Sequence, residues 1–225
     1  MAQRIVILGG HGKVARLLAP KLTTAGFAVD AVIRDPDQRG DIEAAGGHPV
    51  VLDVETASID DFAGVFAGAT AIVFAAGAGG GNPARTRAVD FEAATRSMEA
   101  AEKAGVKRYV MVSYNRAADH YRALEPDHRF YPYAKAKHDA DAYLRGTDLD
   151  YSILGPGLLT LEPATGKLQL ADAHGQVDGD WSDKKNVTSR DNVAEVIAHA
   201  IQHDVALRQT VNFYDGDTPL ARAVK

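Results

Sequence analysis

Residues 4–15 are Arg-Ile-Val-Ile-Leu-Gly-Gly-His-Gly-Lys-Val-Ala, and this stretch determines the predicted fold. The apolar run at 5–8 is typical of a short strand covered on both faces, and it stops at a glycine. A helical pattern begins at Lys13 and continues to Gly26, a residue type that often ends a helix in the left-handed conformation. Residues 4–26 therefore predict a strand, a tight glycine-rich turn and a helix.

Within the turn, Gly9, Gly12 and Ala15 have the spacing G-x-x-G-x-x-A. The first glycine permits the sharp turn, the second lets a pyrophosphate approach the backbone, and the small third residue lets the helix pack against the strand. The helix N-terminus adds free N–H groups and a partial positive charge, which suit phosphates. A glycine-rich turn that only connects two elements is the alternative interpretation. We expect a dinucleotide to bind through Gly9, Gly10, His11, Gly12, Lys13 and Val14.

Further apolar runs rich in Val and Ile recur along the chain, separated by segments of helical character. Together they predict about seven strands, at 4–8, 28–33, 49–52, 70–74, 108–113, 149–154 and 210–214. Because these runs do not alternate with polar residues, they suit strands with helices on both sides. We predict an α/β fold, a doubly wound Rossmann-type parallel sheet, in a single domain that spans 1–225.

Helix boundaries and loops follow from local signals. Gly105 predicts the end of a helix over 84–104, and Ser189 is the predicted N-cap of the last helix. In the former helix an apolar stripe is expected to lie on the sheet, formed by Phe91, Ala94, Met98 and Ala101. The stretches 114–130 and 158–187 predict long loops, and long loops in compact domains are often functional. We expect 114–130 and 155–188 to form a small substrate-side region.

The end of the second strand bears on the choice of cofactor. NAD sites place an acidic residue there, whereas NADP sites use an arginine near the 2′-phosphate. Arg34 ends this strand and Arg39 offers a second contact, so NADP(H) is preferred. NAD(H) stays possible if Asp35 faces the ribose instead, and a solvated strand-end Arg34 is the alternative without a ligand. At the ends of the next two strands, further cofactor contacts are expected from Asp53, Ala75, Ala76 and Gly77.

Composition excludes several classes of protein. The chain has a net charge of −5 and lacks the cluster of basic residues that nucleic-acid binding requires. It has no cysteine, which excludes disulfides and thiolate metal sites. No apolar run approaches the length of a membrane span. Glu195, His199 and His203 have a spacing compatible with zinc, but histidines near a helix C-terminus complement its dipole, so no metal is expected. We expect a cytoplasmic monomer or homodimer whose partner is a small-molecule substrate.

Several stretches match one family in the correct order. They are 9–15, 32–36, 104–113, 136–137 with 149–154, 189–194 and 216–219. On these residues the chain resembles the atypical short-chain dehydrogenases/reductases, in the NAD(P)H-binding branch that includes NmrA-like and flavin-reductase-like proteins. The resemblance covers nearly the whole chain.

The resemblance implies a catalytic Tyr-x-x-x-Lys pair, which matches Tyr133 and Lys137. Residues four apart share a helix face, so Lys137 is expected to lower the pKa of the Tyr133 hydroxyl and make it a better proton donor. In the family this lysine also holds the nicotinamide ribose, and a serine that matches Ser113 steadies the substrate carbonyl. The resemblance also places Pro156, in the turn after the sixth strand, among the cofactor contacts.

Two positions depart from the family pattern. Many relatives have a second serine where this chain has Tyr114, and they commonly carry arginine where it has Gly155, although Pro156 and Gly157 are kept. Both departures leave cofactor binding intact and bear on turnover. The resemblance therefore implies an NADPH-dependent oxidoreductase that reduces a carbonyl, quinone or flavin-like acceptor. A non-catalytic NADP(H)-sensing regulator is the alternative, and a nucleotide-sugar epimerase or dehydratase is disfavoured because only 70 residues remain from Pro156 onward.

Overall fold

The strand β1 (Arg4–Leu8) lies in the interior of the sheet, with β2 on one side and β4 on the other. Its side chains alternate between two apolar layers: Ile5 and Ile7 pack in one, and Val6 and Leu8 pack in the other. A strand without polar side chains is stable only where both faces of the sheet are covered, as they are here. The computed structural model describes residues 2–79, 81–177 and 186–225.

Seven strands run parallel, in the spatial order β3-β2-β1-β4-β5-β6-β10. Their bounds beside β1 are His48–Val51 for β3, Ala28–Ile33 for β2, Ala71–Phe74 for β4, Arg108–Val112 for β5, Asp150–Pro156 for β6 and Gln209–Asp215 for β10. The strand order reverses between β1 and β4, and in such sheets ligands bind beyond the carboxyl ends of the strands near this point. The predicted doubly wound α/β fold is confirmed.

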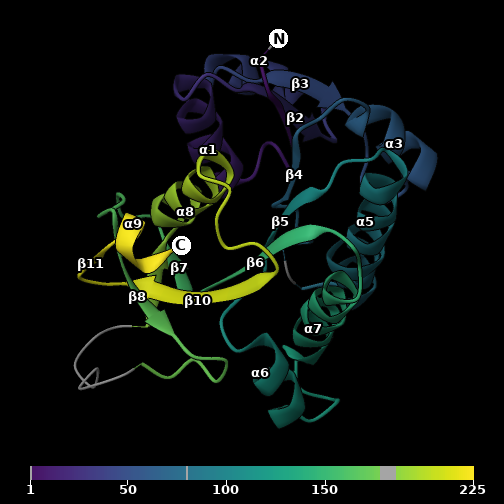
Figure 1. The fold of residues 1–225 in the computed structure, drawn as a ribbon. Helices are drawn as coiled ribbons and strands as arrows, with labels where there is room; N and C mark the ends of the chain where they lie inside the picture. The colour runs from purple at the N-terminus through teal and green to yellow at the C-terminus, as the bar shows by residue number, and fades with distance from the viewer. Residues whose placement is uncertain (1, 80, 178–185) are drawn as a thin grey trace.

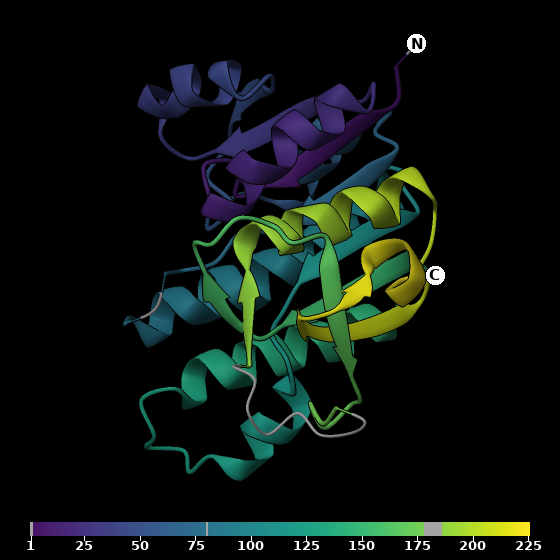
Figure 2. The ribbon, with the colours of Figure 1, turned by 90° about the vertical axis from the view of Figure 1, so that its left-hand side faces the viewer.

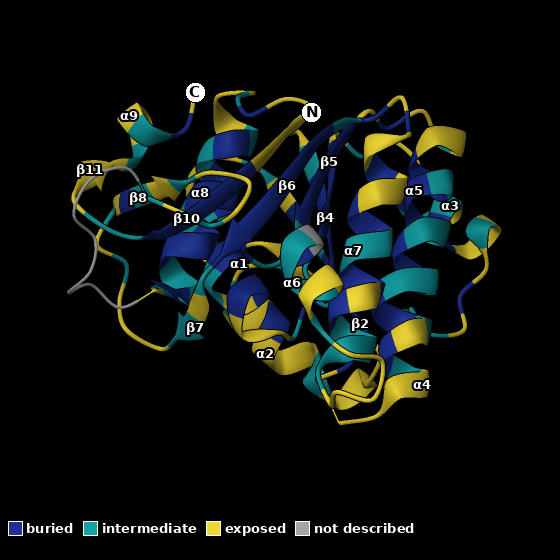
Figure 3. Cartoon of the chain, turned by 90° about the horizontal axis from the view of Figure 1, so that it is seen from below, coloured by how far each residue is buried: buried dark blue, intermediate teal, exposed yellow. Residues whose placement is uncertain are grey.

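Helices cover both faces of this sheet (Figure 1). On one face lie α1 (Lys13–Thr24) and α8 (Arg190–Gln202), which run side by side in Figure 2. On the other lie α3 (Ile59–Phe66), α5 (Ala94–Lys103) and α7 (Tyr131–Arg145). Figure 3 shows the buried strands between helices whose outer sides are exposed. None of the helices in the described ranges combines the length and apolar character that crossing a membrane requires.

The strand count is larger than the seven predicted. Within the described residues β8 (Lys167–Ala171) pairs antiparallel with β10, β11 (Thr218–Pro219) extends the same edge, and β7 (Leu158–Thr160) pairs with β9 (Val187–Ser189). The prediction of a loop over 158–187 was therefore wrong for β7 and β8. These strands are short and largely polar or exposed, so their pairing partners define them rather than a hydrophobic pattern. Residues 178–185 of the expected substrate-side region lie outside the described residues.

The other predicted loop, 114–130, contains the helix α6 (Ala117–Ala123), so that prediction was also wrong in part. The predicted helix over 84–104 is divided: α4 (Pro83–Thr86) continues into a π-helical stretch, η2 (Arg87–Ala93), before α5. The remaining short elements are η1 (Pro36–Gln38), α2 (Arg39–Ala44) and α9 (Leu220–Ala223). Both glycine helix ends are confirmed, with φ of +91° at Gly26 and +73° at Gly105.

Candidate dinucleotide and acceptor site

The glycine turn joins β1 to α1 in the conformation that its sequence predicts. Gly9 has φ of +82°, and a Cβ there would lie 2.6 Å from the Cα of Ala76. Gly12 is exposed at the N-cap of α1, so a ligand can approach its backbone. Gly10 has a different role, because a Cβ on it would lie 2.7 Å from the Cβ of Ala31 in β2. It allows close packing of the turn on the sheet.

Two cavities lie along the carboxyl edge of the parallel strands. The smaller has a volume of about 310 Å³ and the larger about 700 Å³, and both are lined by Gly12 and by Ala75, Ala76 and Gly77. Gly9, His11, Arg34 and Asp53 also line the smaller cavity, and Lys13, Val14, Ser113, Tyr133 and Lys137 line the larger. Of the site residues predicted from the sequence, Gly10 and the buried Pro156 are in neither lining.

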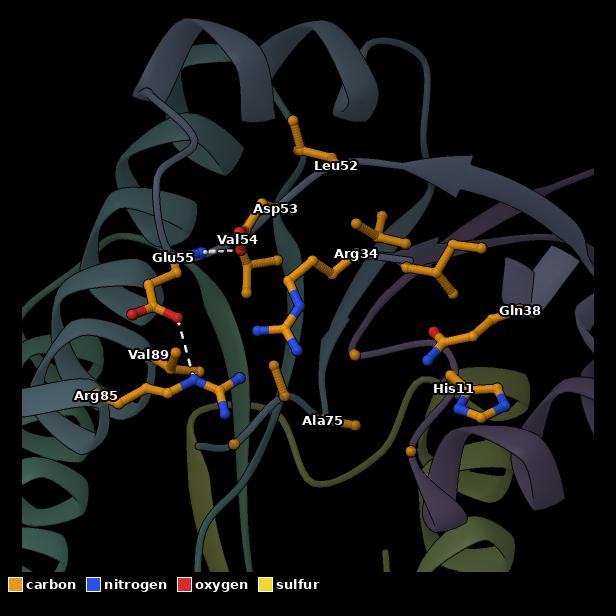
Figure 4. A pocket seen from close by; sticks show the side chains of 16 residues that line it. His11, Arg34, Gln38, Leu52, Asp53, Val54, Glu55, Ala75, Arg85 and Val89 are labelled. Carbon is orange, nitrogen blue, oxygen red and sulfur yellow. Dashed lines mark hydrogen bonds and ion pairs between the residues drawn. The ribbon is translucent and has the colours of Figure 1, made fainter. Parts of the chain in front are cut away.

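The smaller cavity presents an arginine that is available for an anion. Arg34 projects into it from the end of β2, and no ion pair involves Arg34 in the described part of the chain (Figure 4). The neighbouring Asp35 is engaged elsewhere, since its carboxylate accepts the backbone N–H of Asp37 at 3.0 Å and caps η1. The guanidinium of Arg34 can therefore bind an anion in this cavity, whereas the carboxylate of Asp35 is engaged in capping η1.

The second arginine at this cavity is Arg85, not Arg39 as the sequence suggested. Arg39 begins α2 and is absent from the lining, whereas Arg85 extends from α4 toward the same space as Arg34. Its Nε donates to Glu55 Oε2 at 3.1 Å, which fixes the guanidinium and half neutralises it. Sequence gave no signal for Arg85, because α4 reaches this edge only through the fold.

At the larger cavity, Tyr133 and Lys137 lie four residues apart on α7 and both line the wall. The pKa of the Tyr133 hydroxyl is raised by burial, and further by the carboxyls of Asp90 and Asp141. The direction expected from the sequence was therefore wrong. Desolvation and two nearby carboxylates disfavour the phenolate, and the ammonium of Lys137 is itself paired with Asp90. Tyr133 is therefore a neutral phenol that carries its proton, and it is a weaker acid than the sequence predicted.

Lys137 is buried and bound on two sides. Its Nζ donates to the Val112 carbonyl at 2.8 Å and lies 3.6 Å from Asp90 Oδ1. Asp90 comes from the π-helical stretch η2, and its other oxygen accepts the N–H of Ala78 at 3.1 Å. This carboxyl therefore links the lysine to the 77–79 segment that lines the larger cavity. Nothing in the sequence pattern relates Asp90 to Lys137, because the link exists only in three dimensions.

Behind the cavity wall, Ser113 donates its hydroxyl to Asp141 Oδ2 at 2.7 Å. Asp141 is buried, and its Oδ1 has no hydrogen-bond partner in the described structure. Burial raises the pKa of Asp141 to about 6, although Ser113, Lys137 and Arg145 oppose the rise. The spacing Tyr133, Lys137, Asp141 repeats every four residues along one helix face, a signal that sequence analysis overlooked.

The structure explains the two departures from the family pattern. Tyr114 packs its ring against Tyr133 and Phe130, with ring centroids 5.6 and 5.9 Å apart, so an aromatic cluster fills the position of the second serine. At Gly155, a Cβ would lie 2.1 Å from Asn212 Oδ1. The Asn212 amide donates to the Asp172 carbonyl at 2.9 Å and thereby occupies the space that a larger side chain would need.

The acidic and histidine residues of α8 have other partners. Glu195 accepts from Lys21 Nζ at 2.6 Å, and the His199 ring contacts the Val224 carbonyl at 3.1 Å. The His199 and His203 rings lie 4.5 Å apart, centroid to centroid. Among the residues that the structure describes, no group of histidine and acidic side chains is arranged to hold a metal.

A doubly wound sheet with a glycine turn at its switch point and a cleft along its carboxyl edge defines a dinucleotide-binding protein. The chain belongs to the NAD(P)H-binding family, whose model matches residues 9–204. An uncharacterized sugar epimerase of Bacillus subtilis is 31% identical to it over 224 residues, 99% of each chain.

Solved structures of similar proteins share this fold over nearly the whole chain. A putative NAD-dependent epimerase/dehydratase from Bacillus halodurans is 32% identical, with a TM-score of 0.84 and 98% of each chain covered. An anaerobilin reductase from Escherichia coli O157:H7 is 25% identical, with a TM-score of 0.74 over 96% of this chain and 98% of that one. The resemblance found in the sequence is confirmed.

Proposed function

We propose that this protein is an NADPH-dependent reductase that transfers hydride to a small carbonyl, quinone or flavin-like acceptor. One observation carries the proposal: the Arg34 cavity and the Tyr133 cavity are both lined by Gly12 and 75–77, and so form one cleft. An anion-binding arginine at one end and a proton donor at the other are what an extended dinucleotide and a reducible acceptor require.

The residues fit the cofactor. Gly9 and Gly12 leave the backbone open at the N-terminus of α1, where a pyrophosphate is stabilised by free N–H groups. Arg34 would hold the 2′-phosphate, which favours NADP(H), whereas NAD(H) would leave this arginine without its partner. Lys137, anchored by the Val112 carbonyl, would hold the nicotinamide ribose. When bound, NADPH would supply the hydride.

The chain itself would supply the proton. As the acceptor carbon gains hydride, its oxygen gains negative charge and takes the proton of the Tyr133 hydroxyl, and the tyrosinate is then reprotonated from solvent. Lys137 stabilises that transient anion, and a neutral Tyr133 before the step is the form that can donate. Ser113, at the same wall, would contact the acceptor oxygen by exchanging its hydrogen bond to Asp141 for one to the acceptor.

The test is loss of NADPH absorbance with a panel of quinones, flavins and aldehydes. Removing the hydroxyl in Tyr133→Phe should slow carbonyl reduction about 100-fold or more, as general acids contribute about that much. Tyr143→Phe is the matched control, because Tyr143 is exposed on α7, is not in the cavity lining, and donates its hydroxyl to Glu99. Equal carbonyl reduction rates for the wild type and Tyr133→Phe would remove Tyr133 from the mechanism.

A sensor of NADP(H) that does not turn it over is the second candidate. The aromatic cluster around Tyr114 and the occupied space at Gly155 favour it, because both replace side chains that its relatives place at the acceptor end. Tight NADPH binding with no oxidation by any acceptor supports the sensor. Epimerisation, the activity in the names of two relatives, would instead proceed without net loss of NADPH.

A further inference from the structure

The larger cavity has an unbalanced set of charges. Its cationic lining residues are Lys13, Arg129, Lys137 and Arg190, and its acidic one is Asp90. Asp90 is already engaged by Lys137 and by the Ala78 N–H, so it does not neutralise the others. Lys13 lies in the first turn of α1, where the cofactor pyrophosphate is expected. Two arginines are left without an assigned role.

Arg190 is held in place rather than free in solvent. Its Nη1 donates to the carbonyl oxygens of Leu159 and Thr160 at 3.0 and 2.9 Å, which fixes the guanidinium against β7. No carboxylate pairs with Arg190 or with Arg129 in the described ranges of the chain. A fixed, half-buried guanidinium with unused donors is suited to bind a planar anion.

The rest of the lining is apolar and aromatic at the same end. Phe130 and Pro132 come from the start of α7 beside Arg129, and Leu159 comes from β7 beside Arg190. Small-molecule sites typically combine such an apolar wall with a few fixed polar groups that set orientation. The wall suits a flat hydrocarbon body, and the arginines suit an acidic group attached to it.

We propose that the acceptor is a carboxylate-bearing molecule with a flat apolar body, and that Arg129 and Arg190 bind its carboxylate. The inference rests on the proposed reductase function and names the substrate class for the same site. The apolar body would lie against Phe130 and Leu159, with the reducible group toward Tyr133. The arginines determine which acceptors bind, whereas Tyr133 and Lys137 act on the reacting atoms.

The test measures binding, so it does not depend on turnover. Naphthalene-2-carboxylate and its neutral carboxamide are titrated calorimetrically into the protein saturated with NADP⁺. The wild type should bind the carboxylate at least about 10-fold more tightly, the usual range for a charge-assisted hydrogen bond. In the double variant Arg129→Gln, Arg190→Gln, the two ligands should bind within about 2-fold of each other. The matched control is Arg122→Gln, which removes an exposed charge of α6 outside the cavity and should keep the preference.

Further variants separate a structural effect from loss of the anion site. Because Arg190 also holds β7, Arg129→Gln alone is measured, since Arg129 is an exposed side chain on a loop, and it should lower the preference about 3-fold or more. A wild type without preference for the carboxylate overturns the proposal, as does a double variant that keeps the preference. The proposal is also overturned if the variants weaken NADPH binding and leave the carboxylate preference unchanged, because the arginines would then bind the cofactor. Absence of NADPH oxidation with every acceptor, with the carboxylate preference intact, refutes the reductase and leaves the anion site standing.

Discussion

The buried carboxyl of Asp141 should make the protein less stable as pH rises. Its pKa is raised from 3.8 to about 6 in the folded state, so the folded protein holds this proton more tightly than the unfolded chain does. Below pH 3.8 the carboxyl is protonated in both states and costs nothing. Between these two pKa values Asp141 ionises in the unfolded chain but stays protonated in the folded protein, which lowers the free energy of unfolding. Above about pH 6 the carboxyl is ionised in both states, and the loss of stability is complete.

The magnitude follows from the two pKa values. The complete penalty is about 3 kcal/mol, and roughly half of it develops between pH 5 and pH 8. Asp141→Asn keeps the size of the side chain and an oxygen that can accept from Ser113, but it cannot ionise. The free energy of unfolding of Asp141→Asn minus that of the wild type should therefore rise by about 1–2 kcal/mol from pH 5 to pH 8.

Urea unfolding of both proteins at several pH values measures this difference directly. Asp139→Asn, which removes a carboxylate of the same helix that pairs with Lys135, controls for the loss of one negative charge. Ser113→Ala adds a second check: it deletes a hydrogen bond that lowers the pKa of Asp141, so the loss of stability should extend to higher pH. A difference between Asp141→Asn and wild type that stays flat from pH 5 to pH 8 would refute the reasoning.

Three other experiments test the cleft and its supports by substitution. Arg34→Ala should weaken NADPH about 10- to 100-fold and NADH much less in fluorescence titrations, and an equal loss for both would remove the 2′-phosphate role. Gly9→Ala should lower the free energy of unfolding by about 3 kcal/mol or more in urea. The control Gly26→Ala should lower it by only about 1 kcal/mol, because Gly26 has a similar φ but no neighbours within 4 Å of an added Cβ. Gly155→Ala should destabilise the protein by about 1–3 kcal/mol, and Asn212→Gly in the same chain should relieve the clash, so a double variant no more stable than Gly155→Ala counts against it.

The local sequence pattern predicted those helices, strands and turns whose conformation depends mainly on residues close by in the sequence. The strand, glycine turn and helix of residues 4–26 were predictable, because a buried parallel strand and a tight turn restrict residue type directly. The spacing of Tyr133 and Lys137 placed both side chains on one face of α7, as the cavity lining confirms. Asp141 lies four residues beyond Lys137, so its position on the same helix face was also predictable from the sequence.

What the sequence did not determine is the set of contacts between distant segments. Strand β8 exists because β10 offers a hydrogen-bonding edge, and Arg85 replaces Arg39 at the cofactor cavity because α4 reaches that edge. The pKa of Tyr133 rises rather than falls, since desolvation and the approach of Asp90 depend on the whole fold. Residue type and spacing thus determined the fold class and the placement of Tyr133 and Lys137 on one helix face. Burial and long-range contacts, which no local pattern encodes, decided the electrostatics of the site.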